Sequence, residues 1–286
     1  MADTLTRSKA KIGAEAHLTQ PKVLSFTSGK GGVGKTSLSV NTALTLAAMG
    51  RRVVLLDADL GLANVDVMLG ISPEKSLYHL FRGEAGLRDI LFETPYGFSI
   101  LPAASGVIDM LELSTGQKLE LLESMDMLEN ETDYLIVDTG AGINDNVTYF
   151  NIAVQERVLV MTPEPTSLTD AYALIKVLKL EHNVERFRVI VNMAPDLPTA
   201  KKTFSKLFAA CDHFLSGISL DLLGHVPADP KVRHAIGRQV PFTAQNPESP
   251  ASRSLSEITL KLDALEPARK LDGNIKFFWK KLLFQE

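Results

Sequence analysis

A chain of 286 residues with 45% hydrophobic and 22% charged residues has the composition of a soluble globular protein, and its length suits one α/β domain with extensions. No apolar run approaches the ~18 residues of a membrane span, and the charged start of the chain is not that of a secretory signal. The net charge of −4 gives no general reason to expect nucleic-acid binding. The single Cys211 excludes an internal disulfide, suits a reducing cytoplasm and argues against an iron–sulfur cluster.

In chain order, a polar and weakly periodic segment over 1–20 predicts a mobile arm, and alternating strand and helix patterns follow over 21–265. Strands are expected at Val23–Ser28, Arg52–Asp57, Phe98–Leu101, Tyr134–Asp138, Val158–Met161, Arg188–Val191 and in a run ending near Pro227. Helices are expected at Ser37–Met49, Gln117–Met127, Asn146–Ala153, Ser167–Glu181, Thr199–Phe214 and Ser252–Leu265. Several strands are continuous runs of Val, Leu and Ile, as expected for strands covered on both faces. The pattern predicts an α/β fold with a doubly wound, mainly parallel sheet flanked by helices.

The most informative motif lies between the first strand and the first helix. It reads Gly29, Lys30, Gly31, Gly32, Val33, Gly34, Lys35, Thr36, the Walker A spacing of a P-loop. Glycines let backbone N–H groups close around a phosphate at the positive end of the helix that Ser37 opens. Lys35 would neutralise β- and γ-phosphate oxygens, and the Thr36 hydroxyl would hold Mg²⁺. A glycine-rich turn without a ligand is the alternative.

Lys30 is a second lysine inside this loop. Because Lys35 already serves the site's own phosphates, Lys30 is redundant within one subunit. It is explained if it points outward to a nucleotide held by a second copy of the chain, which a long and flexible cation can reach. A solvated loop lysine is the alternative.

Three aspartates stand at or just past the ends of two predicted strands. Asp138 ends a hydrophobic strand, as a Walker B aspartate does, and would hold Mg²⁺ through water; capping of a helix is its alternative role. Asp57 and Asp59 close the second strand, and two carboxylates beside a triphosphate repel it unless Mg²⁺ and water intervene. We assign Asp57 to the Mg²⁺ water shell, with capping of the next loop as its alternative, and Asp59 to orienting the attacking water.

The end of the chain carries a separate signal. Residues 266–273 read as a linker, and an amphipathic helix is expected over 274–286. Its apolar residues fall on one helical face, flanked by lysines: Ile275, Phe278, Trp279, Leu282 and Leu283. Such a helix is too short to cross a bilayer but can lie in an anionic membrane surface. Permanent docking on the protein's own core is the alternative. A third hypothesis combines them, with ATP-driven dimerisation freeing a docked helix.

The motifs resemble those of the MinD/ParA family of deviant-Walker ATPases. The resemblance rests on the two-lysine loop, on residues 57–64 and on residues 138–142; segments 64–70, 101–106 and 164–176 are similar to the flagellar-number regulators, the FlhG/FleN group. The resemblance implies a MinD-like P-loop fold, slow and partner-stimulated ATP hydrolysis with Mg²⁺, and a homodimer that encloses ATP. It places Lys30 on the partner's phosphates and makes Asp59 the hydrolytic residue. It also assigns adenine-edge positions to Asn192, Pro227 and Asp229.

The same resemblance implies a biological role. It points to control of flagellar number and placement through a signal-recognition-type GTPase and, in some members, a flagellar transcriptional activator. It implies a cytoplasmic protein that binds the inner face of the cell membrane peripherally. Two departures are visible: Gly140 stands where MinD proper usually has proline, and residues 12–18 lack the N-terminal motif with which many flagellar members stimulate the GTPase.

The residues also bear on other functions found in this superfamily. A ParA-like DNA-partition ATPase needs a basic surface. The candidates for it are Lys176, Lys179, Arg186, Arg188, Lys201, Lys202 and Lys206. Charge runs are usually solvated faces, so direct DNA binding is not expected. A metal-cluster carrier would need more than Cys211, and a tyrosine kinase of this fold would need a terminal tyrosine cluster that the chain lacks.

Overall fold

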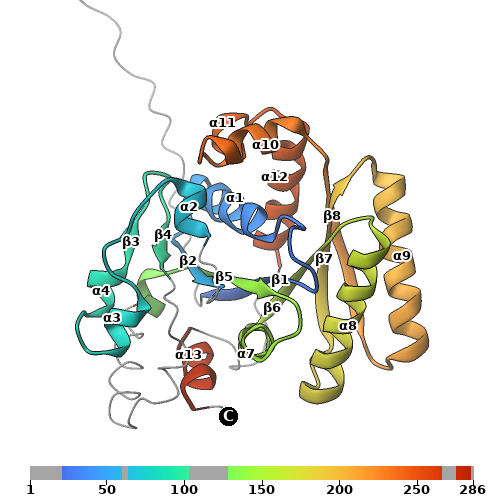
Figure 1. Cartoon of the computed structure of the whole chain (residues 1–286), viewed down its shortest axis with the longest axis horizontal. Coiled ribbons are helices and arrows are strands. Elements are labelled where there is room, and N and C mark those ends of the chain that lie inside the picture. The colour runs from blue at the N-terminus through green and yellow to red at the C-terminus, as the bar shows by residue number, and fades with distance from the viewer. Residues whose placement is uncertain (1–20, 60–63, 103–127, 266–274, 285–286) are drawn as a thin grey trace, which may run out of the picture.

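A computed structural model describes residues 21–59, 64–102, 128–265 and 275–284 (Figure 1). The described strands form one sheet in the order β3-β4-β2-β5-β1-β6-β7-β8. Their bounds are β1 Lys22–Ser28, β2 Val53–Ala58, β3 Phe92–Glu93, β4 Ser99–Leu101, β5 Tyr134–Ala141, β6 Glu156–Met161, β7 Arg186–Ala194 and β8 Ser219–Pro227. Neighbouring strands are parallel except for the short edge strand β3, which runs antiparallel to β4. The predicted doubly wound, mainly parallel sheet is confirmed.

The sheet is buried on both faces, and its central strands are largely apolar. In β5, Tyr134 and Ile136 pack into one core cluster, whereas Leu135 and Val137 pack into a second cluster on the opposite face. This follows from the alternation of side chains along a strand. All four are fully buried. Runs without polar alternation therefore mark strands that helices cover on both sides.

Helices form a layer on each face (Figure 1). One layer contains α1 Lys35–Ala48, α10 Pro230–Gly237, α11 Phe242–Gln245 and α12 Pro250–Asp263, and the other contains α7 Asp145–Ala153, α8 Pro165–His182, α9 Leu197–Phe214 and α13 Ile275–Phe284. Three short helices connect β2 to β3: α2 Val65–Leu69, α3 Leu77–Phe81 and α4 Leu87–Ile90. None of the described helices combines the length and the apolar character needed to cross a lipid bilayer.

The long elements agree with the sequence prediction to within a few residues at their ends. The helix expected over 117–127, the arm over 1–20 and the linker over 266–273 lie outside the described residues. The prediction missed β3 and the short helices α2, α3, α4, α10 and α11. Elements this short show too few turns or alternations to give a periodic signal, so tertiary contacts fix them.

Candidate functional site

The loop between β1 and α1 has backbone geometry that only glycine tolerates at certain positions. Gly34 has φ of 89°, and a Cβ placed on it would lie 2.3 Å from Nδ2 of Asn192. A Cβ on Gly29 would lie 2.0 Å from the carbonyl oxygen of Asp170 in α8. Side chains at these two positions would collide with their neighbours. The glycines therefore let the loop pack closely between the sheet and α8.

The start of α1 is arranged to receive an anion. Gly34 occupies the N-cap position, no side chain caps the helix, and no acidic residue lies in its first turn. The first N–H groups of the helix are thus available to an external acceptor, at the end where the helix dipole is positive. The Ser37 hydroxyl in this turn is buried and has no hydrogen-bond partner among the described residues.

Two carboxylates meet beside this loop because β2 and β5 are neighbours. Asp57 and Asp138 are paired in register, and both side chains are buried. Nζ of Lys35 lies 3.3 Å from Oδ1 of Asp138. Burial raises the pKa of Asp138, while Lys35 and a hydrogen bond with the Thr36 side chain oppose that rise. The structure thus brings together the Walker lysine, the Walker hydroxyl and both predicted carboxylates.

Asp57 has a structural task in this arrangement. Its carboxylate accepts hydrogen bonds from the backbone N–H groups of Asp59 (3.1 Å), Asn64 (3.0 Å) and Val65 (3.2 Å), so it caps the start of α2. Burial and then the neighbouring charge of Asp138 raise the pKa of Asp57 to about 7. The capping role that the sequence left open is present here, and the predicted role in a Mg²⁺ water shell stays a prediction.

The donor set fits Mg²⁺. Oδ2 of Asp138 is buried and has no hydrogen-bond partner within the described parts of the chain. The Thr36 hydroxyl is hydrogen-bonded to the Asp138 side chain, and Asp57 is the register partner of Asp138, so this group of side chains offers oxygen ligands, as Mg²⁺ prefers. A buried carboxylate oxygen without a partner is costly unless a ligand satisfies it. Thr36 and Asp138 would therefore hold the ion, with Asp57 near its water shell.

Asp59 directly follows the end of β2 and lies close to Gly140 in β5. Its side chain is half-buried, and a Cβ added to Gly140 would lie 3.4 Å from Oδ1 of Asp59. The absence of a side chain at Gly140 therefore leaves the carboxylate room beside β5. The hydrolytic role of Asp59 stays a prediction.

Lys30 occupies the outer side of the loop. Its Nζ donates hydrogen bonds to Oε2 of Glu164 and to Oγ1 of Thr166, each at 2.8 Å. Its side chain is 35% exposed and that of Glu164 is 64% exposed. Lys30 thus contacts the start of α8, whereas Lys35 contacts Asp138 in β5. The sequence did not reveal these two partners.

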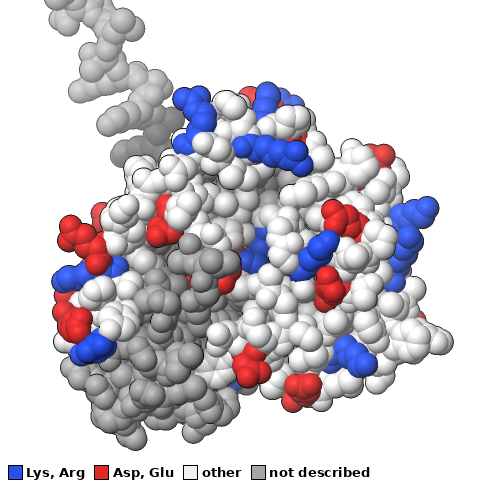
Figure 2. Space-filling view, in the orientation of Figure 1, with Lys and Arg blue, Asp and Glu red and all other residues white. Residues whose placement is uncertain are grey.

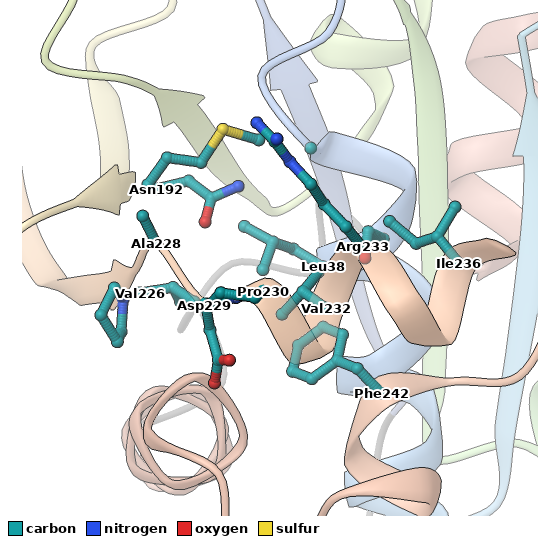
Figure 3. Close-up of a pocket in the computed structure, with 14 residues that line it drawn as sticks. Leu38, Asn192, Val226, Ala228, Asp229, Pro230, Val232, Arg233, Ile236 and Phe242 are labelled. Carbon is teal, nitrogen blue, oxygen red and sulfur yellow. The ribbon is translucent and has the colours of Figure 1, made fainter.

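A mainly apolar cavity of about 390 Å³ adjoins the loop (Figure 3). It is lined by the three predicted adenine-edge residues, Asn192, Pro227 and Asp229. The other lining residues come from the phosphate loop, α1, the ends of β7 and β8, α10 and α11: Gly34, Ser37, Leu38, Met193, Val226, Ala228, Pro230, Val232, Arg233, Ile236 and Phe242. The size and lining are those of a small-ligand pocket next to a phosphate loop. The α10 residues were missed by sequence reasoning, although Asp229 followed by Pro230 is a recognisable helix start.

Asn192 joins this cavity to the phosphate loop. Its Nδ2 donates to the carbonyl oxygen of Val33 at 2.7 Å. This bond fixes the amide so that Oδ1 is the atom left to accept a hydrogen bond. Asp229 has a second function, because its Oδ1 caps α10 by accepting from the N–H of Lys231 at 2.9 Å.

The apolar face of the terminal helix is buried on the body of the protein. Ile275, Phe278 and Trp279 are at most 1% exposed. The Phe278 ring stacks on Phe150 of α7 with centroids 6.3 Å apart, and the Tyr149 hydroxyl donates to the backbone oxygen of Lys281 at 3.1 Å. The docked arrangement that the sequence left open is therefore the one observed. The side chains of Leu282 and Leu283 lie outside what the structure describes.

Comparisons with known proteins agree with this geometry. Residues 21–193 match a family model described as an AAA domain. The antiactivator FleN of Pseudomonas aeruginosa is 45% identical over 262 residues, which cover 92% of this chain and 93% of FleN. The flagellum site-determining protein YlxH of Helicobacter pylori is 32% identical over 268 residues, covering 92% and 90% of the two chains. The chain belongs to the MinD/ParA family of ATPases. Within that family it falls in the FlhG/FleN group.

A solved structure of this ATPase family supports the same assignment. The septum site-determining protein MinD of Pyrococcus horikoshii, complexed with Mg-ADP, matches with a TM-score of 0.67 and 27% identity. The match covers 85% of this chain and 96% of that chain. This MinD/ParA-type ATPase thus shares its fold with that MinD over most of the chain.

Proposed function

We propose that this ATPase binds ATP with Mg²⁺, dimerises around the nucleotide, binds the membrane reversibly and regulates the number and placement of flagella. The observation that carries the proposal is the position of Lys30. Its amine lies on the outer side of the loop, where exposed groups bind it, while Lys35 lies at the buried carboxylate Asp138. One loop therefore presents two cations in two directions, as a site shared between two copies requires.

Each part of the site has a task in hydrolysis. The loop N–H groups and Lys35 bind and orient the β- and γ-phosphates, which positions the terminal phosphorus for attack. Asp59, half-buried next to Gly140, orients the attacking water. Mg²⁺, when bound at Thr36 and Asp138, neutralises charge that develops on the phosphate oxygens. Hydrolysis is slow and regulatory in this proposal, and a partner stimulates it.

The apolar cavity suits adenine. Because Nδ2 of Asn192 is engaged by Val33, its Oδ1 faces a ligand as an acceptor. The exocyclic amine of adenine donates to such an acceptor, whereas guanine has an oxygen at the corresponding position. Two facing acceptors would leave a buried oxygen unsatisfied, so the site favours ATP over GTP. The apolar lining binds the rest of the base.

The terminal helix provides a membrane switch. We take residues 21–265 as the ATPase domain, 266–273 as a linker and 274–286 as the membrane-targeting helix. Docking buries the aromatic face, yet the indole N–H of Trp279 has no hydrogen-bond partner among the described residues. A buried donor without an acceptor costs about 1–3 kcal/mol, which weakens docking and makes release feasible. Two released helices on one dimer bind a membrane together far more tightly than one does.

The partners follow from the relatives. One relative is described as an antiactivator and another as a flagellum site-determining protein. For this chain we infer an action on a flagellar signal-recognition-type GTPase, on a flagellar transcriptional activator, or on both. The protein would work in the cytoplasm and on the inner face of the cell membrane.

The alternative of a DNA-partition ATPase is not favoured. Among its candidate cations, Lys179 is paired with Glu185 and Arg188 with Glu156 and Asp221. Figure 2 shows Lys and Arg interleaved with Asp and Glu on the face in view. The relative at 32% identity is described as a flagellum site-determining protein and the relative at 45% identity as an antiactivator, and neither description mentions DNA partition.

Liposome sedimentation tests the proposal. Vesicles containing anionic lipid should retain the full-length protein with a non-hydrolysable ATP analogue and retain much less with ADP. Equal retention with both nucleotides would contradict a nucleotide-controlled switch. A salt-sensitive retention on DNA with no lipid binding would support the partition alternative instead.

A further inference from the structure

Two short helices, one at the base cavity and one at Asp57, end against one another. α2 ends at Gly70, which has φ of 65°, and α10 is followed by Gln239, which has φ of 56°. A Cβ added to Gly70 would lie 3.3 Å from Cβ of Gln239. The two helix ends are therefore packed tightly together, although 169 residues separate these positions in the numbering.

Gln239 occupies the left-handed position just after the C-terminal end of α10, where glycine is the usual residue. The N–H of Gln239 donates to the carbonyl oxygen of Ile236 at 2.9 Å, and that of Val240 donates to Ala235 at 3.2 Å. This is the hydrogen-bond pattern of a helix end whose left-handed residue is most often glycine. A side chain in that conformation is unfavourable relative to glycine, so its presence calls for a compensating interaction.

The compensating interaction is a bond between the two helices. Nε2 of Gln239 donates to the carbonyl oxygen of Val67, in the last turn of α2, at 2.8 Å. The Val67 oxygen also accepts from the backbone N–H of Gly70 at 3.2 Å, so the amide of Gln239 is a second donor to it. Gln239 is thus a direct link from the end of α10 to the end of α2.

Each helix reaches one half of the nucleotide site. The start of α2 is held by Asp57, which accepts from the N–H groups of Asn64 and Val65. α10 lines the apolar cavity with Val232, Arg233 and Ile236 (Figure 3). A continuous series of contacts therefore runs from the base cavity through α10, Gln239 and α2 to the carboxylate at the phosphate end.

We propose that Gln239 is a positioning residue that couples occupation of the base cavity to the placement of Asp57, so that base binding and Mg²⁺ binding support each other. The proposal rests on the proposed nucleotide-binding function. A helix of five residues held at both ends moves as one piece, so a displacement of α10 by a base is passed to the residues that Asp57 caps. Coupling between two ligands is reciprocal, so Mg²⁺ must tighten base binding by the same factor.

The coupling is measured with a ligand that has a base and one that lacks it. ADP and inorganic pyrophosphate are titrated into the full-length protein by calorimetry, each with and without Mg²⁺; diphosphates are used because they should not induce dimerisation. In the wild type, we expect Mg²⁺ to increase the affinity for ADP more than it increases the affinity for pyrophosphate. The two increases should differ by about threefold to tenfold, which corresponds to the net contribution of one hydrogen bond.

The variant Gln239→Gly is the informative one. Glycine keeps the left-handed conformation and removes the amide, so the fold is retained while the bond to Val67 is lost. In this variant the Mg²⁺ effect should become equal for the two ligands. The exposed neighbour Arg238→Ala keeps the bond and should keep the wild-type difference.

The outcomes separate the two proposals. Equal Mg²⁺ effects in the wild type, or a difference that persists in Gln239→Gly, would overturn the coupling while leaving nucleotide binding intact. No binding of ADP under any condition would overturn the proposed function and the coupling with it. A change confined to the melting temperature of Gln239→Gly would show that the residue serves only the fold.

Discussion

The Lys30 amine and the Glu164 carboxylate are joined by a 2.8 Å hydrogen bond within one chain, at the start of α8. Both side chains are substantially exposed, so solvent screens their attraction and the pair contributes only about 0–1 kcal/mol. A phosphate of higher charge competes for the same amine without a large cost. Lys30 can therefore exchange its hydrogen bond to Glu164 for a contact with the phosphates of a nucleotide bound to a facing copy.

The first prediction concerns this exchange. With ATP and Mg²⁺, the variant Lys30→Ala should remain monomeric because its loop lacks the cation that crosses to the partner's phosphates. Asp59→Ala should accumulate as a dimer because ATP is bound and not hydrolysed. Light scattering after size-exclusion chromatography measures both, and Glu164→Gln serves as a control that retains Lys30 and should still dimerise. A Lys30→Ala protein that dimerises like the wild type would remove the role across the interface.

The second prediction concerns the backbone of the loop. Gly34→Ala should lower the free energy of unfolding by several kcal/mol, because the methyl group would lie 2.3 Å from Asn192 at a φ of 89°. Gly31→Ala is the matched control, since nothing lies within 4 Å of its added Cβ and its φ is not positive. Its effect should stay within about 0.5 kcal/mol. Urea unfolding in the absence of nucleotide makes the comparison, and equal losses in the two variants would contradict the steric argument.

The third prediction concerns the base. Asn192→Ala removes the acceptor that faces the cavity, so ATP should bind about tenfold more weakly and the preference for ATP over GTP should shrink. Competition between the two nucleotides for a fluorescent ADP analogue measures this preference. Because Asn192 also binds Val33, a loss of affinity alone would be ambiguous. An unchanged ratio of ATP affinity to GTP affinity would show that Asn192 does not discriminate between adenine and guanine.

Sequence reasoning found the parts of the site that are local in the chain. The loop from Gly29 to Thr36 and the hydrophobic run that precedes Asp138 carry their own signals, because spacing and hydrophobic runs are visible in one segment. The parallel strands place Asp57 opposite Asp138 once their order is known. These features were predicted because each needs only a neighbouring stretch of residues and the rules of parallel sheets.

The rest of the site depends on contacts between distant segments. Glu164 and Thr166 contact Lys30 although more than 130 residues separate them from it in the sequence. No residue pattern predicts these contacts. The docking of the terminal helix could not be decided either, because one apolar face suits a membrane and a protein core equally well. Only the geometry shows that Phe278 lies on Phe150.

The fourth prediction concerns pH. Because the pKa of Asp57 is raised to about 7 in the folded chain and is near 3.8 in the unfolded one, the folded state binds the extra proton between these values. The free energy of unfolding should therefore fall as pH rises from about 4 to 7, by as much as about 4 kcal/mol from this group alone. Asp57→Asn stays neutral and should show a smaller fall. Urea titrations of protein freed of nucleotide and Mg²⁺ measure the difference, and identical slopes would contradict the raised pKa.

The fifth prediction concerns release of the terminal helix. Tyr149→Phe removes the hydroxyl that donates to the backbone of Lys281 and leaves the ring in place. The docked form should lose about 0.5–1.5 kcal/mol, which shifts the docking equilibrium by about twofold to tenfold toward release. The variant should therefore bind anionic vesicles more strongly than the wild type in the presence of ADP.

The only tryptophan of the chain reports this equilibrium directly, because Trp279 is buried when the helix is docked. Its emission should move to longer wavelength in Tyr149→Phe with ADP, and in the wild type when ATP is added without lipid. Tyr96→Phe, whose ring packs against the core on the opposite face of the sheet, is the control and should leave the emission unchanged. If ATP leaves the wild-type emission unchanged while the protein still binds vesicles, the helix is freed by the membrane and not by the nucleotide.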